Sequence, residues 1–202
     1  MKKLILPLIA LLLFSFSNDT FKLSNEDRKT AVDHLKKTRN EMSKVLRGLT
    51  EEQLNFTPGE NVWSIAQCVE HLAISENMIF GMLEGALQTA ADPSKRTEVK
   101  LSDEELLGII ESREKRVKTR EPFEPSGKFG SFEATLNEFL TKRNEHISYL
   151  KKTDDDLRNH YGELPFGTID GLQIVLFMSG HTKRHVDQMK EVMAHESFPK
   201  GK

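Results

Sequence analysis

Apolar residues recur about every 3.6 positions in several long stretches of the chain, which is the spacing of one helix face. Ala31, Leu35, Met42 and Leu46 follow this spacing in the first stretch. Alternation typical of a half-buried strand is absent over any useful length. The pattern predicts helices over residues 25–47, 64–89, 102–119, 131–152 and 168–196. We therefore expect an all-α protein, an up-down-up-down four-helix bundle with one short extra helix before the third long helix.

Polar residues that can cap a helix precede the predicted helices. Ser24 or Asn25 can cap the first of them. Ser102 is followed three positions later by Glu105, which is the spacing of a capping box. Thr168 is the expected cap of the last helix. These residues support the predicted starts independently of the apolar spacing.

The first seventeen residues have the pattern of a secretory signal. A basic start, Met1-Lys2-Lys3, precedes residues 4–14, which are apolar except for Pro7, and small residues then predict cleavage after Ser17. The division is a signal peptide at 1–17, a linker at 18–24, the bundle at 25–196 and a tail at 197–202. The apolar run is about half of the roughly 20 residues that span a membrane, so we expect an exported, periplasmic or secreted protein with no stable membrane span after cleavage. An uncleaved anchor and a buried first helix are the alternatives.

Composition excludes several functions. The chain has 202 residues, which suits one domain, and 31 acidic residues nearly balance 29 basic ones. A broad nucleic-acid surface needs a basic excess, so no nucleic-acid partner is expected. The single cysteine, Cys68, excludes an intramolecular disulfide. The basic run at 113–120 has Glu114 within it and Glu111 and Glu121 flanking it, and it is interpreted as a solvated helix face.

Histidines are the candidate chemical groups. His181 and His185 are four residues apart on the last predicted helix, so their side chains share one face and can meet one metal ion. Apolar residues at 174, 178, 189 and 192 flank that face, which directs the pair toward the core. Buried imidazoles need a metal or hydrogen-bond partners, and the spacing leaves both open. The His-Glu-x-x-His pattern of zinc peptidases is absent.

His71 is the candidate third ligand. It lies at the border of the apolar face of the second long helix, and a bundle can bring that helix close to the last one. Three neutral imidazoles plus water would form a divalent-metal site with an open position. The alternative for His71 is a half-exposed polar residue. Cys68 is interpreted as a small core residue, with a fourth ligand or a reactive thiol as alternatives.

A family resemblance connects these residues. Asn61-Val62-Trp63-Ser64-Ile65, then His71-Leu72, and the late His181-x-x-x-His185 together resemble the DinB-like (damage-inducible) superfamily over about residues 25–195. The stretch Leu49-Thr50-Glu51-Glu52-Gln53-Leu54, just before Pro58 and Trp63, looks similar to its DinB_2 branch. The resemblance implies a four-helix bundle that holds a divalent metal, zinc or nickel, on His71, His181 and His185. It also implies similarity to bacillithiol transferases and mycothiol-dependent maleylpyruvate isomerases, and a homodimer as a further expectation.

The functional hypothesis is a metal-dependent thiol S-transferase that acts on a small electrophile with a low-molecular-weight thiol. A non-catalytic metal-binding or stress-associated interaction protein is the alternative, and a metal-dependent hydrolase is the third option. Gln67 and Gln188 are the candidate residues for orienting the ligands, with ordinary surface polarity as their alternative.

Overall fold

The structure is a computed structural model that describes residues 22–201. The predicted signal peptide and most of the linker lie outside these residues. Six α-helices, three short 3-10 helices and two strands follow one another along the described chain. They are α1 (Asn25–Leu46), α2 (Glu51–Asn55), α3 (Ile65–Leu87), η1 (Pro93–Glu98), α4 (Asp103–Glu111), η2 (Glu121–Phe123), α5 (Phe132–Lys152), η3 (Leu157–Asn159), β1 (Tyr161–Leu164), β2 (Gly167–Asp170) and α6 (Gly171–Met193).

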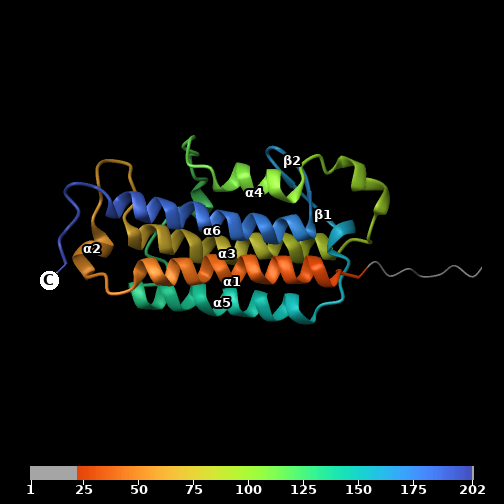
Figure 1. The fold of residues 1–202 in the computed structure, drawn as a ribbon, viewed down its shortest axis with the longest axis horizontal. Helices are drawn as coiled ribbons and strands as arrows, with labels where there is room; N and C mark the ends of the chain where they lie inside the picture. The colour runs from red at the N-terminus through yellow and green to blue at the C-terminus, as the bar shows by residue number, and fades with distance from the viewer. Residues whose placement is uncertain (1–21, 202) are drawn as a thin grey trace, which may run out of the picture.

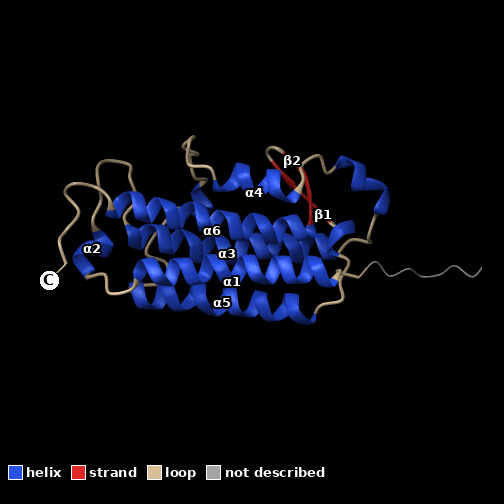
Figure 2. Cartoon of the chain, viewed as in Figure 1, coloured by secondary structure: helices blue, strands red, loops and turns tan. Residues whose placement is uncertain are grey.

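The long helices α1, α3, α5 and α6 form the bundle, and α4 lies along its outside (Figure 1). The predicted all-α four-helix bundle with a short extra helix before the third long one is confirmed. Helices dominate the described chain, with a single hairpin between η3 and α6 (Figure 2). None of the described helices has the length and apolar character needed to cross a membrane.

The direction of the long helices differs from the expected simple alternation. α1 and α6 run one way, whereas α3 and α5 run the other (Figure 1). Each of α1 and α3 packs against both α5 and α6, so α1 and α3 lie diagonally opposite each other. The reason is α4, which carries the chain back along the bundle between α3 and α5. With α4 counted, successive helices after α2 do reverse direction each time.

Side-chain caps set most helix starts. Ser24 caps α1, and Ser102 forms the expected capping box with Glu105 at the start of α4. The predicted cap of the last helix is wrong by two residues, because Asp170 caps α6 through a box with Gln173. Thr168 instead lies in β2, opposite Glu163 of β1. This hairpin was not predicted, because its two four-residue strands are too short to show a clear alternation.

The helix predicted over 102–119 ends at Glu111, eight residues early. Beyond it the chain crosses toward α6, where Arg113 pairs with Glu191 and the Lys115 carbonyl accepts a bond from Arg184. α4 itself packs closely on α6. A Cβ at Gly180 would lie 3.3 Å from Ile110 and Leu107 side-chain atoms, so glycine permits this approach.

A buried polar layer divides the apolar core into two clusters. One cluster surrounds Leu35, Leu83 and Leu172, and the other surrounds Leu72 and Val186. The layer between them draws on all four long helices through Thr38, Glu76, Arg143, His146, Ser179 and Thr182. The core is therefore not continuous along the bundle.

Candidate metal centre

Three histidines converge between α3 and α6. His71 Nε2 lies 3.0 Å from His181 Nε2, which in turn lies 3.2 Å from His185 Nε2. One ring nitrogen from each residue falls within 4.8 Å of the others, an arrangement that could hold a metal ion. His181 and His185 share one face of α6, as their spacing predicts. His71 reaches them because α3 and α6 are direct neighbours in this bundle.

Hydrogen bonds at the far side of two rings determine which nitrogen carries the proton. His71 Nδ1 donates to the Phe123 carbonyl oxygen at 2.7 Å, and His185 Nδ1 donates to Gln188 Oε1 at 2.9 Å. Since both oxygens only accept, the neutral rings present unprotonated Nε2 atoms to the centre. His181 Nε2 can donate one hydrogen to one of them. At least one of the two short Nε2–Nε2 contacts is therefore left without a hydrogen bond between its atoms.

A divalent cation would satisfy all three nitrogens at once. Neutral imidazole is a usual ligand of zinc, copper, iron and nickel. Three protein ligands leave one position of a tetrahedral zinc site for water or substrate. The three imidazoles thus fit a divalent transition metal, at a site that can take a further ligand.

Burial favours the neutral form of each ring. Desolvation lowers the pKa of His71, and its bond to the Phe123 carbonyl partly offsets that effect. Desolvation also lowers the pKa of His181 and His185 well below the ordinary value, and the neighbouring histidines lower each of them further. Because only an unprotonated ring nitrogen binds a metal, the site is ready to bind at neutral pH.

Aromatic side chains surround the histidines. The Trp63 ring centre lies 4.9 Å from that of His71 and 6.1 Å from that of His185. Phe177 stacks nearly parallel to His181, with ring centres 6.0 Å apart. His71 and His185 are buried, whereas His181 is only partly buried. These aromatic rings form walls around the three imidazoles.

The two glutamines proposed to orient the ligands differ in position. Gln188 contacts His185, and its Oε1 also accepts a longer bond of 3.4 Å from Arg113. Gln67 does not contact the histidines. Its side chain is exposed and closes the capping box with Ser64 at the start of α3. Gln67 lies one turn before His71, in the first turn of α3. At that position its side chain completes the capping box instead of contacting a histidine.

The segment around η2 contributes contacts that sequence reasoning missed. The Phe123 carbonyl orients His71, and the Glu70 carboxylate accepts the backbone N–H groups of Ser126 at 3.0 Å and Lys128 at 2.8 Å. A backbone carbonyl leaves no trace in the sequence. The adjacent residues Glu70 and His71 thus hold the same loop against α3.

Cys68 is a core residue, as interpreted from the sequence. Its side chain is fully buried in the cluster around Leu72 and Val186. Burial raises the pKa of the thiol to about 12. The group of described residues that could hold a metal does not include it. Cys68 therefore stays protonated and unreactive at neutral pH.

The polar layer contains a buried ion pair. Arg143 donates to both carboxylate oxygens of Glu76 at 2.7 Å, and His146 Nδ1 bonds to the same carboxylate at 2.9 Å. Arg143 also donates to Thr182, the residue that follows His181 in α6. The layer thus contacts the turn of α6 that carries the candidate ligands.

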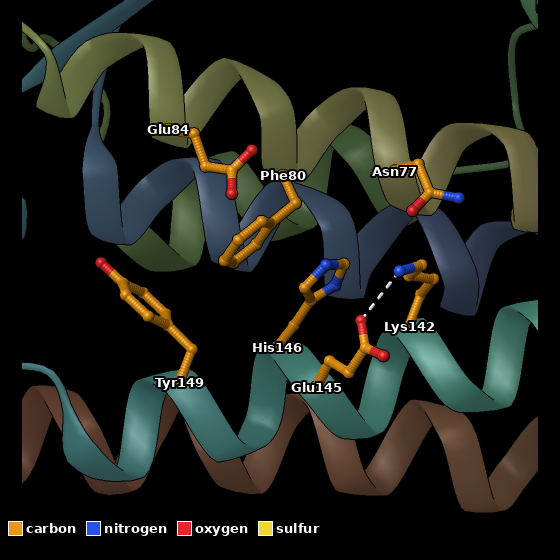
Figure 3. A pocket seen from close by; sticks show the side chains of 7 residues that line it. All are labelled: Asn77, Phe80, Glu84, Lys142, Glu145, His146 and Tyr149. Atoms are coloured by element: carbon orange, nitrogen blue, oxygen red, sulfur yellow. Dashed lines mark hydrogen bonds and ion pairs between the residues drawn. The ribbon is translucent and has the colours of Figure 1, made fainter.

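On the other side of that layer, His146 faces a pocket between α3 and α5 (Figure 3). The Phe80 ring stacks on the imidazole with ring centres 3.8 Å apart. The pocket has a volume of about 350 Å³. Its lining residues are Asn77, Phe80, Glu84, Lys142, Glu145, His146 and Tyr149. The pocket lies on a different face of α3 from the face that carries His71.

A four-helix bundle with three convergent histidines between two of its helices defines a class of candidate metalloproteins. Residues 34–189 match the DinB_2 family, described as the DinB superfamily, and the chain belongs to that superfamily. The chain is 27% identical over 150 residues to the uncharacterized protein YuaE of Bacillus subtilis (strain 168), covering 73% of this chain and 87% of YuaE.

A solved structure shows the same fold. YfiT from Bacillus subtilis superposes with a TM-score of 0.59 at 15% identity, over 88% of this chain and 91% of YfiT. YfiT is described as a probable metal-dependent hydrolase with an unusual four-helix bundle topology. The likeness covers most of both chains and shows that the two proteins share a fold.

Proposed function

We propose that this DinB-superfamily protein binds zinc or nickel through His71, His181 and His185 and is a metal-dependent thiol S-transferase for small electrophiles. One observation carries the proposal. Two Nε2 lone pairs, fixed by bonds at Nδ1, face the third histidine at 3.0 and 3.2 Å. A cation is the partner that this arrangement lacks.

The metal would supply acidity, because a bound thiol loses its proton near neutral pH and becomes a nucleophile. The protein residues supply position. The N–H group at His71 Nδ1 donates to the Phe123 carbonyl oxygen, which keeps Nε2 unprotonated and available. Trp63 and Phe177 restrict water around the rings, and the partly exposed side at His181 admits the reactants. With a chloroaromatic electrophile, a carbon–sulfur bond forms, chloride leaves with the carbon–chlorine electron pair, and buffer takes the thiol proton.

A metal-dependent hydrolase is the second candidate, supported by the description of YfiT. Activation of water usually benefits from a carboxylate or histidine base next to the metal. Among the described residues, the group that could hold a metal consists of histidines alone. In the neighbouring residue Glu70, Oε1 accepts two backbone N–H groups of the loop, which ties this carboxylate to the loop. A thiol needs no such base once it is bound, and this favours transfer over hydrolysis.

The test begins with elemental analysis of the wild type and His185→Ala, both purified without chelator or histidine tag. We expect near-stoichiometric zinc or nickel in the wild type and its loss in the variant. Metal-loaded protein is then assayed with 2-mercaptoethanol and 1-chloro-2,4-dinitrobenzene, and separately with p-nitrophenyl acetate. Thiol-dependent turnover supports the transferase, and ester cleavage without thiol supports the hydrolase. Bound metal with neither activity supports the non-catalytic alternative, and a metal-free wild type after reconstitution refutes the metal site.

Export and self-association complete the proposal. Export rests on residues 1–17, and bacillithiol and mycothiol are cytoplasmic, so an exported transferase would use another small thiol. Amino-terminal sequencing of the protein recovered from its native compartment tests cleavage after Ser17. Light scattering tests the proposed homodimer.

A further inference from the structure

The segment 113–120, between α4 and η2, is strongly basic in a chain that is acidic overall. It contains five basic residues and one acidic residue, Glu114. In Figure 1 it follows α4 as the green loop that leads down to η2. Lys115, Arg116, Lys118 and Arg120 are exposed, and no ion pair of the described residues involves them. Their charge is therefore not neutralised within the described part of the protein.

Contacts at both ends of this segment place it across the three histidines. At its start, Arg113 bonds to Gln188, the partner of His185, and pairs with Glu191 of α6. The Lys115 carbonyl accepts a bond of 2.7 Å from Arg184, the residue before His185. Just beyond its end, the Phe123 carbonyl oxygen accepts a hydrogen bond from His71 Nδ1. The segment thus runs from the α6 side of the site to the α3 side.

Three neutral imidazoles leave the full charge of a divalent cation uncompensated. The carboxylates around the site are already engaged. Glu191 pairs with Arg113, Asp187 pairs with Lys183 and Lys190, and Glu70 accepts loop N–H groups. Like charges that gather around one cleft attract ligands of opposite charge and repel those of the same charge.

We infer that the basic segment 113–120 makes the site selective for an anionic thiol, one that carries a carboxylate or similar acidic group beside its sulfur. This inference rests on the proposed function. The segment acts by charge and position, since its exposed cations lie beside the entrance and not among the candidate ligands. The sequence-based interpretation as a solvated helix face is replaced by a loop with a role in recognition.

The test uses cobalt(II)-loaded protein, in which thiol binding changes the visible absorption spectrum. The probes are 3-mercaptopropionate, 2-mercaptoethanol and cysteamine, which place an anionic, neutral or cationic group two methylenes from the sulfur. The test variant replaces Lys115, Arg116 and Lys118 with glutamine. The control variant makes the same change at the exposed residues Lys37, Lys151 and Lys152, which lie in α1 and at the end of α5. Both variants lose three positive charges, so their net charge is equal.

For a distance of about 10 Å between each charge and a bound head group, removing three charges would change affinity about fivefold at 10 mM ionic strength and about twofold at 0.1 M. We expect the test variant to weaken 3-mercaptopropionate by that factor, to strengthen cysteamine similarly and to leave 2-mercaptoethanol unchanged. Comparison of each variant with the wild type cancels the different acidities of the three thiols. The control variant should match the wild type.

The outcomes separate this inference from the proposed function. Cobalt binding with equal effects of both variants, or with no dependence on probe charge, overturns the anion preference and leaves the thiol site standing. Cobalt binding without any thiol effect overturns both the inference and the thiol chemistry. Failure to bind cobalt overturns the metal site itself and the inference with it.

Discussion

Removing Arg143 is the strongest test of how the bundle is held together. All five N–H donors of its guanidinium have partners. They bond to both Glu76 carboxylate oxygens, to the hydroxyls of Thr38 and Thr182 and to the Leu35 carbonyl. Arg143 is 0% exposed and Glu76 is 1% exposed, so no water can replace these bonds. In Arg143→Met the Glu76 carboxylate would keep only His146 as a side-chain partner.

Breaking a buried ion pair by removing one partner costs about 3–5 kcal/mol. For a domain of this size each kcal/mol lowers the melting temperature by about 2–4 °C. We therefore expect Arg143→Met to melt about 6–20 °C below the wild type at pH 7. The second expectation concerns the pair. Glu76→Leu combined with Arg143→Met removes the unpaired charge, so its cost should fall below the sum of the two single variants by about 2 kcal/mol or more.

The assay is urea unfolding followed by circular dichroism, with all four proteins carrying the same amount of metal. The hydroxyl of Thr38 also donates to the His34 carbonyl oxygen, and that of Thr182 donates to the Met178 carbonyl oxygen. Both hydroxyls therefore keep a hydrogen-bond partner in the double variant. Strict additivity of the two single changes would refute the reasoning, because it would mean that Glu76 gains nothing from Arg143. A cost below 1 kcal/mol for Arg143→Met alone would do the same.

Three further predictions concern other parts of the fold. Burial opposes ionisation of Glu76, but its ion pair with Arg143 lowers the pKa of the carboxyl below the ordinary value. The pair therefore stabilises the fold above about pH 4.3, and this contribution disappears as the pH falls further. Urea midpoints between pH 7 and 3 should fall more steeply for the wild type than for Glu76→Gln. Gly171→Ala should destabilise the fold by about 1–3 kcal/mol, because its Cβ would lie 2.8 Å from the Leu157 carbonyl oxygen. Gly85→Ala in α3 has open space around the new Cβ and should be neutral or stabilising, and thermal melts of both variants check this. Glu70→Ala removes the acceptor of two loop N–H groups and should speed amide hydrogen exchange across residues 124–130, and unchanged exchange there would show that the carboxylate does not hold the loop.

Local patterns in the sequence were sufficient for the helices and for part of the site. The spacing of apolar residues located the long helices, and Ser24 and Ser102 cap them as expected. His181 and His185 share a face because four residues are close to one helical turn, which is a local property. Such features depend on residues that are close together in the sequence, so the sequence alone is enough to predict them.

Features that depend on tertiary contacts could not be predicted from the spacing of residues in the sequence. The end of α4 at Glu111 reflects contacts of the following residues with α6, which join residues 78 and 69 positions apart. The parallel course of α3 and α5 follows from the path of α4, which the apolar spacing does not encode. The Glu76–Arg143 pair joins residues 67 positions apart, each of which looks like a surface residue in its own helix.

The polar layer also bears on how the helices find their alignment while the protein folds. Apolar side chains tolerate a neighbour that has slipped by one turn, because hydrophobic contact has little directional preference. A guanidinium whose five donors need partners on three other helices tolerates no such slip. A shift of α5 by one turn in either direction would move Arg143 by about 5.4 Å and place its unpaired charge in one of the two apolar clusters. The layer thus penalises misaligned compact states, and it sets the register in which His71 meets the two histidines of α6.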